Sequence, residues 1–162
     1  MSVLYYFAAD IPLEEQPNPY ICLLSVNQAL ERGIELDLEM LEGIDRDKPE
    51  TVLYCESKEK FAYPNFFSIQ KEDVYEDIGT KKMFCIKMEW DFAEDTAPVV
   101  LDYIRRQMET CTELEIWSIW LGSEEGVPQQ MKKPVYSIDE LSVNILREFY
   151  LQEGDYRCMV VR

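Results

Sequence analysis

The stretch of residues 83–122 constrains the fold most, because it predicts a strand, a helix and a second strand in direct succession. From residue 84 onward apolar and polar side chains alternate with a period of two, which is the pattern of a strand with one buried face. The apolar members of this alternation are Phe84, Ile86, Met88, Trp90 and Phe92. A half-buried strand is therefore expected here.

The next segment predicts a helix that begins near Asp95 or Thr96, since either side chain can cap free backbone amides. Pro98 falls in the first turn, where a missing amide hydrogen costs nothing. The expected buried side consists of Val100, Ile104, Met108 and Cys111. The expected solvent side pairs Asp102 with Arg106 and Arg105 with Glu109.

Residues 114–121 predict a second strand that is apolar on both faces. Such a strand is either covered on both sides or exposes an aromatic strip. Trp117 and Trp120 would form that strip, and with Trp90 they could stack on a ligand. We favour the alternative that the tryptophans belong to the core, because each can bury a large apolar area.

The rest of the chain adds strands and helices around this β-α-β unit. A continuous apolar run at residues 3–9 predicts a central buried strand, and Ser25 with Gln28 forms a capping box that begins a short helix. Further strands are expected at 51–55, 66–70 and 156–161, and a turn is expected at 58–60. A helix is expected at 138–151, kinked or broken near Ser142. The structure of segments 20–24 and 34–43 stays undecided. This order predicts an α+β fold, with residues 1–162 as a single domain in which two to three helices pack on a mixed β-sheet.

The cysteine and histidine content limits the chemistry. Five cysteines are widely spaced and lie in or beside apolar segments, which indicates reduced core thiols and not a disulfide framework or a zinc site. The chain contains no histidine, so Ser-His and Cys-His nucleophilic pairs are excluded. The glycines form none of the known nucleotide-binding loops, and we expect no cofactor.

The charge is strongly negative, with 32 acidic against 16 basic residues and a net charge of −16. Such a field repels nucleic acids and anionic membranes and speeds association with basic proteins. The alternative explanation of this negative charge is that it only keeps the protein soluble. No apolar run is long enough to span a membrane, and the first residues lack the basic segment of a secretory signal, so we expect a cytoplasmic protein.

Carboxylates are the only reactive groups present in number. Asp91, Glu94 and Asp95 lie where a strand gives way to a helix, and they are weak candidates for a magnesium site. The stronger interpretation is that these acidic residues lie in the first turn of the helix, where their negative charge interacts favourably with the positive end of the helix dipole. The densest acidic cluster comprises Glu72, Asp73, Glu76 and Asp77, and a polar loop after the second strand adds Glu124 and Glu125.

Residues 114–122 (LEIWSIWLG) and 137–141 (SIDEL) resemble segments of small acidic proteins of Gram-positive bacteria, some of which are immunity proteins beside secreted toxins. The net charge of −16, the absence of histidine and the acidic loops favour a non-catalytic protein that neutralises a basic partner such as a nuclease toxin, and the resemblance agrees with this hypothesis. We expect the six carboxylates Glu72, Asp73, Glu76, Asp77, Glu124 and Glu125 to contact that partner. The alternatives are a metal-dependent hydrolase that uses carboxylates, and a structural or regulatory subunit that self-associates through Trp117 and Trp120.

Overall fold

The computed structural model describes residues 2–37, 39, 41–69, 80–121, 131–152 and 156–162. Its contacts divide the chain into two compact units, residues 1–17 with 64–162 and residues 18–63. The fold is α+β, as the sequence predicts. The prediction of one domain over residues 1–162 stays a prediction.

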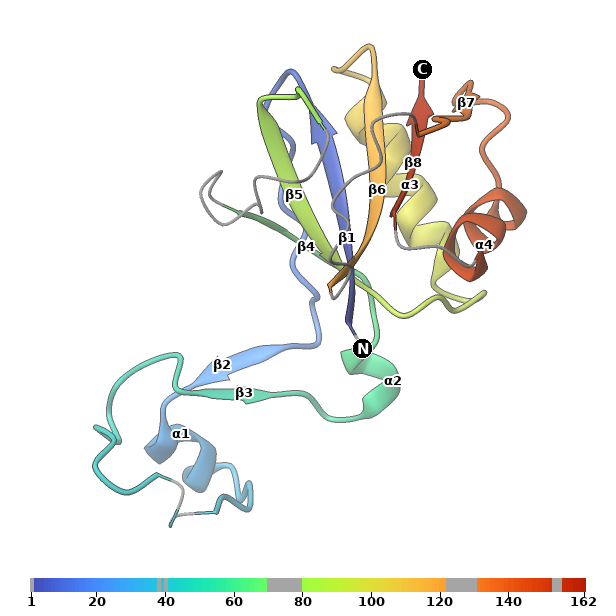
Figure 1. The fold of residues 1–162 in the computed structure, drawn as a ribbon. Helices are drawn as coiled ribbons and strands as arrows, with labels where there is room; N and C mark the ends of the chain where they lie inside the picture. The colour runs from blue at the N-terminus through green and yellow to red at the C-terminus, as the bar shows by residue number, and fades with distance from the viewer. Residues whose placement is uncertain (1, 38, 40, 70–79, 122–130, 153–155) are drawn as a thin grey trace. The chain divides into compact units, whose positions relative to one another are not determined.

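The larger unit contains a six-stranded mixed sheet in the order β4-β5-β1-β6-β8-β7 (Figure 1). Its strands are β1 (Ser2–Ala9), β4 (Asn65–Ser68), β5 (Phe84–Glu89), β6 (Leu114–Leu121), β7 (Val135–Tyr136) and β8 (Tyr156–Val161). Its helices are α3 (Ala97–Met108) and α4 (Val143–Leu151). The smaller unit contains β2 (Cys22–Leu24), α1 (Val26–Glu31), β3 (Val52–Tyr54) and α2 (Lys58–Phe61).

The predicted β-α-β unit is present as β5, α3 and β6, but β1 lies between its two strands. β1 is antiparallel to β5 and to β6, so β5 and β6 run parallel to each other. The expectation that residues 3–9 form a central strand is thereby confirmed. One row of the sheet shows the consequence, because Phe7 is paired with Ile86 on one side and with Ile116 on the other, and all three are buried.

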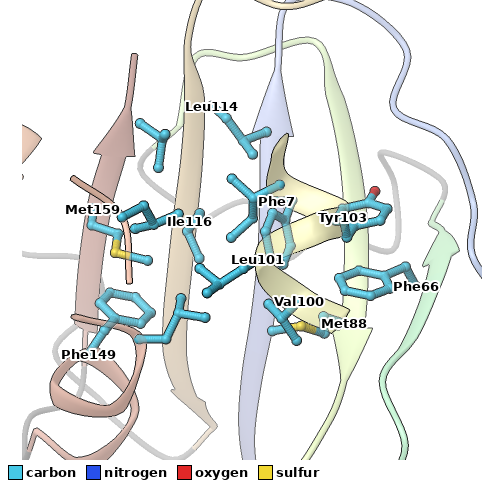
Figure 2. Packing of buried hydrophobic residues seen from close by; sticks show 14 of the residues in the cluster. Phe7, Phe66, Met88, Val100, Leu101, Tyr103, Leu114, Ile116, Phe149 and Met159 are labelled. Atoms are coloured by element: carbon cyan, nitrogen blue, oxygen red, sulfur yellow. The ribbon is translucent and has the colours of Figure 1, made fainter. Parts of the chain in front are cut away.

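The main core lies between this face of the sheet and the two helices (Figure 2). Tyr103 of α3 stacks on Phe66 of β4 with ring centroids 3.8 Å apart, and Phe7 meets both rings edge-on. Tyr150 of α4 stacks on Tyr5 at 4.2 Å. Aromatic side chains from both helices therefore fix α3 and α4 against the sheet.

Several helix ends differ from the predictions. Thr96 precedes α3 but makes no capping bond, because its backbone has φ −102° and ψ −11° and not the extended conformation of a capping residue. Its hydroxyl accepts a hydrogen bond from Trp90 Nε1 at 2.8 Å. The helix predicted at 138–151 begins only at Val143, where Ser142 caps it. Before this helix, residues 138–140 form a turn, and the Ser137 amide donates to Glu140 Oε2 at 2.9 Å.

Three further predictions differ from the structure: the turn at 58–60, the ion pairs on α3 and the burial of the cysteines. Residues 58–60 belong to helix α2 and not to a simple turn, because Ser57 caps the amide of Lys60. On α3, Arg105 pairs with Asp102 at 3.1 Å, whereas Arg106 donates to Gln16. All five cysteines are free, but Cys22 is exposed, so the expectation of core thiols is wrong for this residue.

Candidate protein-interaction surface

The carboxylates predicted to contact a partner cannot be placed. Glu72, Asp73, Glu76, Asp77, Glu124 and Glu125 all lie outside the described residues. The prediction that they form one recognition surface therefore stays a prediction.

The three weak candidates for a metal site do not form one. Asp91, Glu94 and Asp95 are exposed, and Glu94 pairs with Arg147 of α4. Among the described residues, no group of three or more Cys, Asp or Glu side chains is arranged to hold a metal ion. Glu94 and Asp95 precede α3, whose first turn contains no acidic residue, so the helix-dipole interpretation is wrong for them. The ion pair with Arg147 gives Glu94 a different structural role.

Trp117 is fully buried on the second face of the sheet, so it contributes to a core and not to an exposed strip. For Trp120 the structure describes only the backbone. Trp117 Nε1 donates to Glu115 Oε2 at 2.8 Å, and Lys133 lies 4.4 Å from the centre of the indole ring. Tyr6, Ile119 and Cys158 complete the buried surroundings of this indole.

Glu115 is a buried carboxylate that forms hydrogen bonds with Trp117 and Thr80 and an ion pair with Lys133. Lys133 Nζ is 2.9 Å from its Oε1, and the Thr80 hydroxyl donates to its Oε2 at 2.6 Å. A buried charge with an ion pair and two further hydrogen bonds is satisfied, as a structural group must be. Burial also raises the pKa of the neighbouring Cys158 thiol to about 12, which makes it a poor nucleophile.

The smaller unit, residues 18–63, has little hydrophobic core of its own. Over residues 18–63, the buried apolar side chains among those described are Leu24, Val26 and Ala29. Its sheet has only the two strands β2 and β3, and an isolated two-stranded sheet is marginally stable in water. Local hydrogen bonds must therefore contribute much of its order.

Two sets of such bonds are present. Ser25 and Gln28 form the predicted capping box at the start of α1, with the Ser25 amide donating to Gln28 Oε1 at 2.9 Å. Asn18 is 4% exposed, and its Nδ2 donates to the carbonyl oxygens of Lys60 and Tyr63. Asn18 thus ties the chain entering β2 to the chain leaving α2.

Strands β2 (Cys22–Leu24) and β3 (Val52–Tyr54) form a two-stranded ribbon (Figure 1). This β2–β3 ribbon exposes a pair of leucines. Leu23 and Leu53 are directly paired across the strands, so their side chains lie on the same face. They are 52% and 54% exposed. Two large apolar side chains held side by side in water are typical of a protein-interaction surface, whereas single exposed leucines are common on any protein.

The surroundings of this apolar pair are acidic. Residues 18–63 include ten Asp and Glu against five Lys and Arg. Among the described residues of this unit, the one ion pair is between Glu56 and Lys60. Most of these carboxylates therefore keep their charge available for a partner.

A shallow hollow of about 380 Å³ lies in the segment after α1. Its lining combines the apolar Leu41 and Ile44 with the carboxylates of Glu39 and Glu42, and also includes Arg46. Apolar walls with carboxylates nearby suit the stem and charged end of a lysine or arginine side chain. This unit can therefore offer a basic protein both apolar and acidic contacts.

The sequence pattern did not identify Leu23 and Leu53. Each lies in the middle of a three-residue strand, and the pairing that places them on one face joins residues 30 positions apart. The one available signal was the apolar triplet at 52–54, which predicts a strand but not its exposed side.

Comparison with known proteins gives no match, whether with protein-family models, with curated proteins or with solved structures. Within the described part of the chain, none of the helices is both long enough and apolar enough to cross a membrane. The resemblance to small acidic immunity-type proteins stays a prediction.

Proposed function

We propose that this chain is a non-catalytic binding protein that neutralises a basic protein partner, as an immunity or antitoxin protein does. The observation that carries the proposal is the exposed pair of Leu23 and Leu53 on the β2–β3 ribbon. A partner that covers this pair would supply apolar burial that the small unit lacks. The ribbon would then gain stability from the complex.

The charge favours a basic partner. A net charge of −16 attracts a positively charged protein over long distances and raises its rate of association. The same charge repels a second copy of this chain, which argues against self-association through the ribbon. The carboxylates at 72–77 and at 124–125 are kept in the proposal as further contacts, and the cytoplasm is its proposed location.

Affinity capture tests this proposal. The full chain, tagged at its C-terminus, is incubated with extract of its native host at low salt and then washed at high salt. We expect one basic protein to bind at low salt and to be released by the wash, because screening weakens contacts between exposed charges. Recovery of acidic proteins only, or of the same proteins by a chain with Leu23→Ser and Leu53→Ser, would contradict the proposal.

A further inference from the structure

A second hollow lies in the larger unit, beside the open half of β8. β7 pairs with Val160 and Val161 only, so among the described strands none lies beside Tyr156–Cys158 on the side away from β6. The hollow has a volume of about 650 Å³, which is within the range of small-molecule sites. The segment leading into β7 and the end of α4 form its walls.

The described lining of this hollow is basic, whereas the net charge of the chain is negative. Its lining includes Lys132, Lys133 and Arg157, and the described residues of the lining include no carboxylate. Acidic residues outnumber basic ones two to one in the sequence, so solubility does not explain three cations at one place. Phe149, Met131 and Tyr156 add apolar surface to the same lining.

Two of these cations have charge that no described carboxylate neutralises. Arg157 donates to neutral oxygens, at 2.6 Å to the Phe149 carbonyl, at 2.8 Å to the Ser118 hydroxyl and also to the Gln152 carbonyl, so its charge is hydrogen-bonded but not neutralised. Its Nε is a buried donor for which the described residues provide no acceptor. Lys132 is exposed and forms no ion pair with any described residue, whereas Lys133 is already paired with Glu115.

The geometry points to a binding site for a small organic anion, with the negative group beside Lys132 and Arg157 and an apolar body against Met131 and Tyr156. Lys132 can donate charge-assisted hydrogen bonds to an anion there, and the charge of Arg157 adds attraction. The partly exposed apolar surface of the lining favours a ligand with an apolar part over an inorganic ion. This site is independent of the β2–β3 ribbon and of the proposed function.

Titration of the ¹⁵N-labelled full chain tests this inference. The probes are phenylacetate, its neutral amide phenylacetamide, and inorganic phosphate. We expect phenylacetate to shift the amide signals of Lys132, Arg157 and Cys158 in a saturable way, with a dissociation constant on the order of a few millimolar for a ligand of this size. Phenylacetamide and phosphate are each expected to bind more weakly.

Two variants serve as a matched pair. Lys132→Gln removes a charge at the hollow and is expected to weaken phenylacetate binding by about two- to fivefold, the range for an exposed ion pair. Lys48→Gln removes an exposed charge in the other unit and is expected to leave binding unchanged. The inference is overturned if no saturable shift occurs, if the amide binds as well as the acid, or if the two variants behave alike.

Discussion

Leu53→Ser is expected to weaken binding of the basic partner by about 30-fold, because an apolar side chain at the centre of an interface contributes about 2 kcal/mol or more when it is a main contact. The free protein should lose little stability, since Leu53 is 54% exposed and a surface substitution usually changes the free energy of unfolding by about 0.5 kcal/mol or less. Calorimetric titration of the captured partner measures the first quantity, and urea denaturation measures the second.

Leu151→Ser is the matched control for this change. Leu151 is 66% exposed and lies at the end of α4 in the other unit, so its replacement makes the same side-chain change outside the proposed surface. We expect the control to bind the partner as tightly as the original chain. Equal loss of affinity in both variants would show that the ribbon has no special role.

Trp117→Ala is expected to lower the free energy of unfolding by about 4 kcal/mol, which is typical for deleting a buried aromatic side chain. The indole is fully buried, and its removal also takes a hydrogen-bond donor from Glu115 and an aromatic face from Lys133. Because a loss of this size leaves many domains largely unfolded, Trp117→Phe provides a milder variant. It keeps an aromatic ring but removes the donor to Glu115.

Trp90→Phe is the control for the milder variant, since it also removes one indole hydrogen bond, here to the neutral hydroxyl of Thr96. We expect Trp117→Phe to cost more than Trp90→Phe, because bonds to a charged acceptor are stronger than bonds to a neutral one. Urea denaturation followed by circular dichroism measures both. If Trp117→Ala unfolds at the same urea concentration as the original chain, Trp117 is not a core residue.

The sequence predicted the β5-α3-β6 unit well because the signals there are local. The alternation around Ile86 and Met88 and the apolar stripe at Val100 and Ile104 can be read without knowing what lies opposite them. The buried faces observed for β5 and α3 follow these patterns from Ile86 onward, whereas Phe84, predicted for the buried face, is exposed at the start of β5. The position of β1 between β5 and β6 is not local, since any of several strands could occupy that place.

The candidate surface depends on longer-range pairing and could not be predicted in the same way. Leu23 and Leu53 become neighbours only through the register of β2 and β3. For Trp117, the pattern allowed either an exposed strip or a covered face. The outcome depends on Lys133 and Met131, which follow in a separate segment and pack against this face.

Photo-crosslinking within the native host tests the central claim most directly. A photoreactive phenylalanine analogue replaces Leu53 in one version of the full chain and Asp102, an exposed residue of α3, in another. We expect irradiation to join the chain to one basic protein through position 53 and to give no such product from position 102. No product at position 53, or the same product from both positions, would contradict the assignment of the Leu23 and Leu53 face as the recognition surface.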